Sequence, residues 1–343
     1  MADLAPSAVS GQAPAVQGAE GRMRRSVSYA IRLGLGVGIV AYLLWRVGPG
    51  QVAVLVQGLD PYWLLAAVAV QLLAKVVWAL RWSALLRLFS LRPPLVGLIR
   101  AVLVGLFFNN FLPTSVGGDL YRAYWVADGE VGYARSLFLV LMERVIGLIT
   151  LAYVALPALV VLLLGAGLGL DGAVLWIGVV LLALCGSLLL LHPRVLPRLL
   201  GWLSERRGGR LGVPVDLLIE SFAALGRPGA LRWQIISASF GVQLMGIAFY
   251  YCLGRSLSLA LSLGHYFVLA PLVALLTMIP ISLNGIGVRE GSLIVLTAAL
   301  GASVEADQAV ALGLLSSIVV LAVSLLGAIV YVGGRRGKGT LPA

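Results

Sequence analysis

Two arginines stand at corresponding positions of a repeated polar motif, and their side chains are suited to holding an anion. Residues 113–122 and 280–289 carry proline, serine, glycine and arginine in the same register, and the two motifs end in Arg122 and Arg289. A planar guanidinium binds phosphate or carboxylate through two hydrogen bonds. A short helix starting at the glycines would add free N–H groups that favour an anion. The motifs therefore predict a phosphate or carboxylate site, although a single arginine at such a place could also snorkel to lipid headgroups.

Other polar residues lie in or beside the two motifs. Asp119 and Glu290 are expected to form salt bridges, because a buried charge usually needs a partner, with proton carriage as the alternative. The amides of Asn109, Asn110 and Asn284 can bind a headgroup or satisfy the backbone of a broken helix. The remaining candidate binding residues are small ones that bring backbone N–H groups close: Ser115, Gly117, Gly118, Ser282 and Gly285.

Charged residues also occur inside predicted spans. Glu143 and Arg144 lie roughly 10 Å into an apolar run, where a charge costs about 2.5–3.5 kcal/mol and usually faces a polar interior. We expect this pair to line a substrate path or, alternatively, to fix helix packing. Lys75 and Arg81 are further candidate pathway residues. Arg81 followed by Trp82 is also typical of a cytoplasmic membrane interface.

The composition indicates that these residues lie in a membrane domain. Of 343 residues, 60% are hydrophobic and 11% are charged, and the mean hydropathy is +1.02. This apolar content exceeds what one soluble core can cover with polar groups. Runs of about 20 apolar residues, enough to cross a bilayer, occupy about 27–46, 61–80, 136–164, 171–191, 232–253 and 308–332. We predict an all-α polytopic membrane protein with about six full spans.

Two shorter apolar runs lead into the repeated motifs. We expect runs 95–112 and 264–279 to enter the membrane, break at the motif and return, which gives re-entrant hairpins at about 95–127 and 264–301. Three full spans separate these hairpins, so they open from opposite faces as an inverted repeat, and such paired breaks are typical of transporter binding sites. The alternative is that both runs cross the membrane completely.

The distribution of basic residues predicts the orientation. The chain has a net charge of +11, and arginines concentrate in four places: the tail 1–25, the stretch with Arg81, Arg87 and Arg92, the connection 192–231 and the tail 334–343. Lysine and arginine are enriched in cytoplasmic loops. We therefore expect a disordered N-terminal tail, an interfacial connection and a C-terminal tail on the cytoplasmic side, around a transmembrane domain 26–333. The expected location is a prokaryotic plasma membrane.

Residues that hold cofactors are scarce. Cys185 and Cys252 lie in separate predicted spans and the chain has only two histidines, so we expect no metal site. The sequence contains no phosphate-binding loop for ATP. We expect no cofactor and no nucleic acid partner.

The ordered motifs resemble a known family. These are Arg81-Trp82, residues 110–122, Glu143-Arg144 with Gly147, and residues 280–290. They are similar to the transmembrane region of lysylphosphatidylglycerol synthases and of related stand-alone flippase-like proteins, over most of residues 26–333. The resemblance implies a membrane fold that moves a lipid with a modified headgroup between leaflets. In full-length synthases a soluble C-terminal domain attaches lysine to the lipid; this chain stops at Ala343, so we expect no synthase activity.

The leading hypothesis is a lipid flippase whose substrate is a phospholipid, an aminoacylated phospholipid or a polyprenyl-linked glycolipid. The arginines would admit the anionic headgroup while the acyl tails stay in lipid. One alternative is a membrane transferase acting on a lipid phosphate, with Asp119 or Glu143 as general base. Another is a lipid-bound scaffold for a glycosyltransferase, and a lipid-modifying enzyme is a candidate partner.

Overall fold

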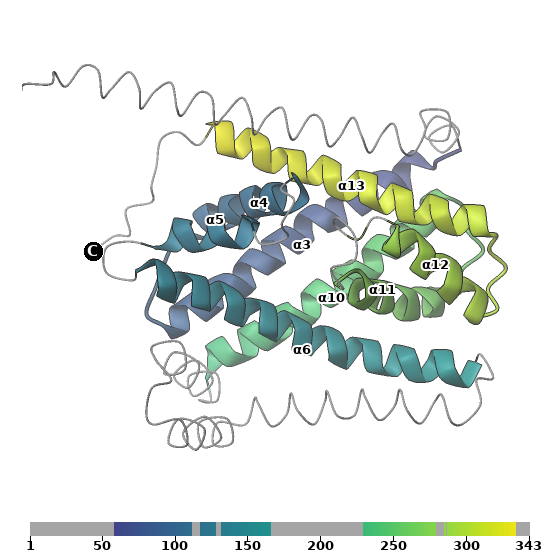
Figure 1. Ribbon diagram of the computed structural model, residues 1–343, viewed down its shortest axis with the longest axis horizontal. Helices are drawn as coiled ribbons and strands as arrows, with labels where there is room; N and C mark the ends of the chain where they lie inside the picture. The colour runs from purple at the N-terminus through teal and green to yellow at the C-terminus, as the bar shows by residue number, and fades with distance from the viewer. Residues whose placement is uncertain are drawn as a thin grey trace, which may run out of the picture. The chain divides into compact units, whose positions relative to one another are not determined.

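The described part of the chain is entirely helical. The structure is a computed structural model that describes residues 58–111, 117–127, 132–165, 229–278, 285 and 287–333, with side chains described outside 161–165 (Figure 1). These ranges form eight α-helices and contain no strand, which confirms the all-α prediction for them. The predicted spans 27–46 and 171–191, both tails and most of the connection 192–231 lie outside the described residues.

Four helices are long and apolar enough to cross a membrane. They are α3 (Pro61–Leu88), α6 (Tyr133–Gly165), α10 (Ala230–Ser256) and α13 (Ala306–Gly333). Each contains one of the predicted spans, so those four predictions are confirmed as helices. The start of α3 is fixed by a capping residue and a proline. Asp60 accepts a hydrogen bond from the Tyr62 backbone N–H at 2.9 Å, and Pro61 occupies the first turn, where its missing N–H is not needed.

Four shorter helices form two consecutive pairs. The first pair is α4 (Leu95–Phe111) and α5 (Gly117–Val126), and the second is α11 (Leu263–Thr277) and α12 (Val288–Ala299). The longest of them has 17 residues, or about 26 Å at 1.5 Å per residue, which is less than the roughly 30 Å of hydrocarbon. The breaks between α4 and α5 and between α11 and α12 fall at the two repeated motifs.

The two halves of the described chain have the same order of helices, and helices of each half pack against helices of the other. Each half runs in the order long, short, short, long. Within each half the two short helices pack on each other, and the second also packs on the long helix that follows it. Across the halves α3 packs extensively along α10, α4 packs on α13, and α11 packs on α6 (Figure 1). The contact between α4 and α13 is close enough that a Cβ atom at Gly327 would collide with the Leu103 carbonyl.

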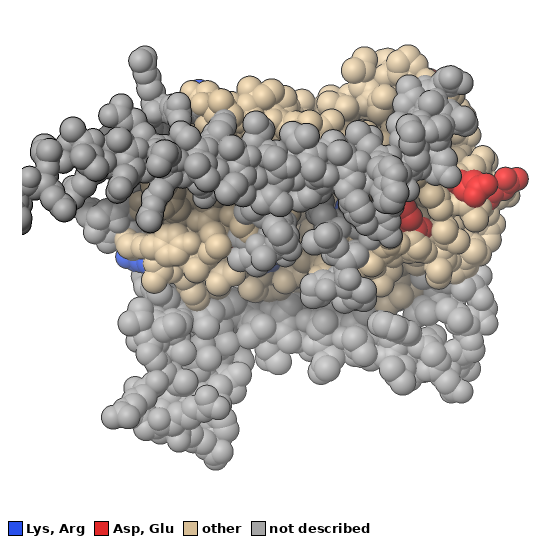
Figure 2. Space-filling view, turned by 45° about the horizontal axis from the view of Figure 1, so that its top comes forward, with Lys and Arg blue, Asp and Glu red and all other residues tan. Residues whose placement is uncertain are grey.

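Two buried apolar clusters lie toward opposite ends of α3. One contains Leu85 and Leu86 of α3 with residues of α4, α5 and the first half of α6. The other contains Ala67 of α3 with residues of α11, α12, α13 and the second half of α10. Where the chain is described, the surface in Figure 2 is mostly uncharged and its acidic side chains gather at one end.

Candidate functional site

Glu143 of α6 is the centre of a buried charge cluster. Its side chain has no exposed surface, although it lies well inside a candidate span. Its Oε2 accepts a hydrogen bond from Arg122 Nη2 of α5 at 2.8 Å, and its Oε1 accepts hydrogen bonds from Trp78 Nε1 at 2.6 Å and from Arg81 Nη2 of α3. A buried carboxylate needs such compensation, because desolvation otherwise outweighs its interactions. The cluster therefore ties α3, α5 and α6 together.

Arg122 is enclosed by aromatic rings as well as by carboxylates. Its guanidinium carbon lies 4.1 Å from the ring centroid of Trp82 and 5.0 Å from that of Trp78. A guanidinium over an indole face is stabilised by the ring quadrupole, most strongly when water is excluded. Trp82 is fully buried and Arg81 is 5% exposed. Both side chains, expected from the sequence to anchor the span at the membrane interface, pack inside the protein, where Glu143 gives Arg81 a buried counter-charge.

Asp119 of α5 carries the second carboxylate of the cluster. Its Oδ2 forms an ion pair with Arg144 of α6, and its Oδ1 lies 3.7 Å from Arg122 Nη1. The predicted salt-bridge role of Asp119 is confirmed. The side chain of Asp119 is 2% exposed, whereas that of Arg144 is 40% exposed, so the cluster reaches the molecular surface at Arg144.

The start of α5 is closed by a neighbouring helix. The backbone N–H of Gly118 donates to Asn109 Oδ1 of α4 at 2.8 Å. A Cβ atom at Gly118 would collide with the carbonyl of Gly105, so only glycine allows the two helices this close. Asn110, the next residue of α4, is buried. Gly118 therefore allows close packing of the two helices. Its N–H was expected to face an anion, but it donates to the Asn109 side chain instead.

Arg289, the counterpart of Arg122, has different surroundings. Its Nη1 donates to Ser317 Oγ of α13 at 2.8 Å, and within the described ranges it forms no ion pair. The predicted salt bridge of Glu290 is also not found there. Glu290 is the third residue of α12, so its Oε2 folds back and accepts from the Gly287 N–H at 2.6 Å, capping its own helix. Gly285 has φ of +74°, a conformation that favours glycine.

A pocket of about 180 Å³ lies beside Arg289. Its walls come from α3, α10, α11 and α13, and they carry several uncharged polar side chains. These are Gln71, Gln243, Tyr250, Thr277 and Ser316. An arginine with uncharged hydrogen-bonding neighbours can hold a phosphate or carboxylate without competition from a protein carboxylate.

A line of polar side chains along α3 leads from this pocket to the charge cluster. Gln71, Lys75 and Trp78 follow one another at four and three residues and share one face of the helix, and Arg81 follows about one turn later. Gln71 lines the pocket, Lys75 Nζ lies 5.7 Å from the Trp78 ring centroid, and Trp78 and Arg81 donate to Glu143. On α10, Gln243 of the same pocket donates to the Gly147 carbonyl at 3.4 Å.

The structure thus separates the predicted site residues into two groups. Arg81, Asp119, Arg122, Glu143 and Arg144 meet in the charge cluster, with Gly117 and Gly118 at the start of α5. Arg289 lies in the other cluster of helices, with Gly285 and Glu290 close to it in the chain. Ser115, Ser282 and Asn284 lie outside the described residues.

Three contributors were missed by sequence reasoning: Gln71 and Gln243 line the pocket, and Trp78 binds Glu143. Asn109 was expected to bind a headgroup or to satisfy the backbone of a broken helix, and it does the latter at the start of α5. The spacing of Gln71 and Trp78 around Lys75 was a usable signal. For Gln243 no local pattern indicates a role, because its importance comes from packing against α3.

Comparison with known proteins identifies the family to which this chain belongs. The model of the lysylphosphatidylglycerol synthase transmembrane region matches residues 29–327. The chain belongs to this family. Members of the lysylphosphatidylglycerol synthase transmembrane family that resemble it include UPF0104 membrane proteins of archaea. One from Methanothermobacter thermautotrophicus is 26% identical over 303 residues, which cover 82% of this chain and 88% of that protein.

Another UPF0104 membrane protein, from Pyrococcus horikoshii, is similar over a shorter stretch. It is 26% identical over 118 residues, which cover 34% of this chain and 35% of the relative. The match therefore spans about a third of the Pyrococcus protein and most of the Methanothermobacter one. Together with the apolar helices, the family match makes the chain a multi-pass membrane protein.

Proposed function

We propose that this chain translocates an anionic or headgroup-modified lipid between the leaflets of the plasma membrane. The observation that carries the proposal is the difference between the two motif arginines. Arg122 is neutralised by Glu143, whereas Arg289 borders a polar pocket and, in the described part of the chain, hydrogen-bonds a serine hydroxyl and no carboxylate. Ionisable groups inside a membrane domain are costly and tend to serve function.

The size of the pocket fits a headgroup better than a whole lipid. A volume of about 180 Å³ admits a phosphate with its immediate substituents. We infer that the headgroup enters this pocket, that Arg289 holds its phosphate, and that Gln71 and Gln243 accept or donate hydrogen bonds to whatever is attached. The acyl tails then remain in the bilayer.

The proposal includes the finer architecture expected from the sequence. We propose that α4–α5 and α11–α12 are re-entrant hairpins that open from opposite faces, and that both chain termini are cytoplasmic. Three features support this arrangement: the short helices, the breaks at the two motifs, and the exchange of packing partners between halves. Irregular backbone at membrane depth is tolerated where it is enclosed by protein, as it would be between two such hairpins.

The polar face of α3 supplies a path between the two arginine sites. Lys75 lies between the pocket, which Gln71 lines, and the charge cluster, which α3 joins through Trp78 and Arg81. A phosphate that leaves Arg289 would meet Lys75 next. We propose Arg144, which is partly exposed, as the point where the path meets the headgroup layer.

A vesicle assay tests the proposal. Purified protein is reconstituted with fluorescent phosphatidylglycerol, and the label in the outer leaflet is bleached with dithionite to follow transfer. We expect faster transfer than in empty vesicles, and we expect Arg289→Gln to remove most of the gain. Arg87→Gln, which changes an exposed arginine at the end of α3, is the matched control and should behave like the wild type. No acceleration for any anionic headgroup would contradict the proposal.

The transferase alternative is less compatible with the cluster. Both oxygens of Glu143 accept hydrogen bonds from arginine or tryptophan, and Asp119 is paired with Arg144. A general base must reach the proton that it removes, and here that position is occupied. Product analysis of purified protein with lipid donors separates the two functions, because only a transferase forms a new lipid. Native mass spectrometry of lipids that copurify with the protein identifies the substrate class.

A further inference from the structure

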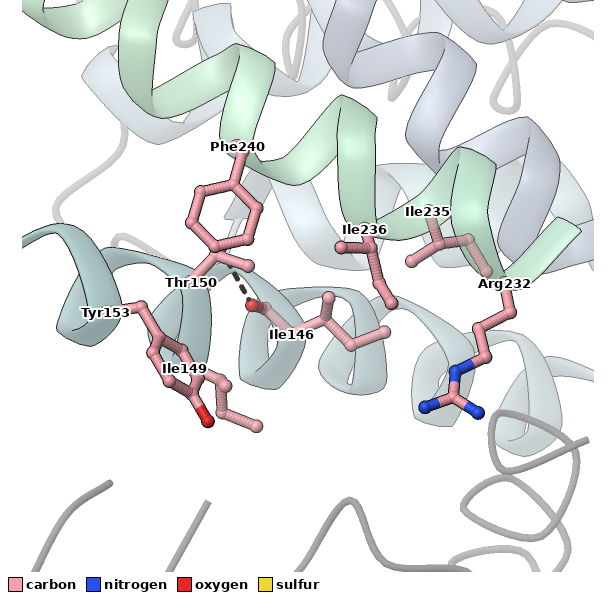
Figure 3. Close-up of a pocket in the computed structure, with 8 residues that line it drawn as sticks. All are labelled: Ile146, Ile149, Thr150, Tyr153, Arg232, Ile235, Ile236 and Phe240. Carbon is pink, nitrogen blue, oxygen red and sulfur yellow. Dashed lines mark hydrogen bonds between the residues drawn. The ribbon is translucent and has the colours of Figure 1, made fainter. Parts of the chain in front are cut away.

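An apolar groove runs between α6 and α10 (Figure 3). Its volume is about 300 Å³, and its walls include Ile146 and Ile149 of α6 with Ile235, Ile236 and Phe240 of α10. The hydroxyl of Thr150, which also lines it, donates within α6 to the carbonyls of Ile146 and Gly147 at 3.0 Å. Because its hydroxyl is bonded within the helix, Thr150 presents its methyl group to the groove and adds to the apolar wall.

The groove continues into a second apolar pocket. This pocket, of about 700 Å³, shares Tyr153 with the first and extends along Val154, Pro157 and Ala158 of α6. Leu244 of α10 and the start of α11 close its other side. Together the two pockets follow α6 from Ile146 to Ala158, or about 18 Å at 1.5 Å per residue. We call this combined surface the α6 track.

Basic and aromatic groups mark one end of the α6 track. Arg232 lies at that end, and Figure 3 shows its guanidinium beyond the isoleucines. Within the described ranges Arg232 has no ion pair or hydrogen bond through its side chain. Trp233 beside it is 68% exposed. Tryptophan and arginine typically lie at the headgroup level of a membrane, which fits a track that begins near the lipid phosphates and runs toward the acyl chains.

We propose that the α6 track is a binding site for one acyl chain of an anionic glycerophospholipid whose phosphate pairs with Arg232. The length of the track, its apolar walls and its single cationic end match the two parts of such a molecule. A lipid seated there lies beside α10, whose Gln243 lines the Arg289 pocket. That this lipid is the transported one rests on the proposed function; the binding itself does not.

Photo-crosslinking in nanodiscs tests the site. The probes are phosphatidylglycerol and phosphatidylcholine that carry a diazirine on one acyl chain, and adducts on the full chain are mapped by mass spectrometry. We expect adducts within residues 146–158 and 232–244. Ile149→Trp should lower the yield about tenfold, because filling the groove removes the burial of roughly two methylene groups. Ile236→Trp, on the opposite wall, should act in the same way.

Matched controls separate groove filling from general effects. Val295→Trp introduces the same ring at a position of α12 that is 65% exposed, and it should leave the yield unchanged. Arg232→Gln should reduce phosphatidylglycerol adducts more than phosphatidylcholine adducts, whereas Arg87→Gln should reduce neither selectively. Equal loss of both probes with Arg232→Gln would overturn the role of the phosphate.

The transport assay distinguishes failure of this inference from failure of the proposed function. Adducts that miss both stretches, with transport intact, overturn the site alone. One cause of that outcome would be that residues 166–228 of this chain fill the track. Adducts at the expected residues without any lipid transfer support the site and overturn the proposed function. If Ile149→Trp and Ile236→Trp both leave the adducts unchanged, the track is not where the acyl chain binds.

Discussion

Arg122 of α5 and Glu143 of α6 form a hydrogen-bonded ion pair at 2.8 Å, and each side chain is at most 1% exposed. The pair joins a ten-residue helix, which has little stability of its own, to one of the longest helices of the protein. Breaking a buried pair leaves an uncompensated charge. The cluster is therefore first a structural requirement, and any test of its functional role must measure folding as well as activity.

Glu143→Gln should destabilise the protein. The substitution removes the negative charge that compensates Arg81 and Arg122, and losing one partner of a buried pair typically costs about 3–5 kcal/mol. We expect a clearly lower melting temperature of the detergent-solubilised protein, followed by fluorescence-detected size exclusion. Glu305→Gln changes an exposed carboxylate and serves as the control. Equal melting temperatures for the two variants would show that the cluster does not stabilise the fold.

Gly118→Ala should separate α4 from α5. The new methyl group would meet the Gly105 carbonyl and lie 2.7 Å from Asn109 Oδ1, so one helix must move. Gly291→Ala is the matched control, because a Cβ atom at this helical glycine has no neighbour within 4 Å. Alanine there should stabilise the protein by up to about 1 kcal/mol through helix propensity. Thermal unfolding of both variants should give shifts of opposite sign.

Ser317→Ala should weaken transport without abolishing it. The serine hydroxyl accepts the hydrogen bond that orients Arg289, and the charge itself survives the substitution. We expect a loss of about tenfold, which corresponds to the weaker hydrogen bonds to a charged group, and a smaller loss than for Arg289→Gln. Transfer of labelled phosphatidylglycerol in vesicles measures it. Ser303→Ala, in the exposed loop before α13, should have no effect.

Cysteine labelling should place the end of α3 and the start of α13 on opposite sides of the membrane. In a background without Cys185 and Cys252, we expect Ser303→Cys to react with an impermeant maleimide from outside the cell. Arg92→Cys, just after α3, should react only after permeabilisation. Both positions are exposed, so reactivity reports sidedness. Outside labelling of Arg92→Cys would reverse the proposed orientation.

Four predicted spans and both helix breaks agree with the structure because they depend on local sequence: apolar length, proline and glycine. The partners of the site residues depend on packing between distant helices. Arg81 and Trp82 fit an interfacial pattern, yet Glu143 lies 62 residues beyond Arg81 and draws it inward. Glu290 was expected to pair with an arginine, but its place in the first turn of α12 directs it to its own backbone. The two motifs have matching sequences, so the sequence did not predict that, among the described residues, Arg122 pairs with a carboxylate and Arg289 does not.

The contact of α13 with α4 has a mechanical consequence. Gly327 of α13 packs against the Leu103 backbone of α4. Nearly three turns earlier, α13 carries Ser317, the hydrogen-bond partner of Arg289. A helix is stiff along its axis, so α13 physically connects the α4 backbone to the hydrogen-bond partner of Arg289. A displacement of α4 is therefore expected to be felt at Arg289, in the other half of the described chain.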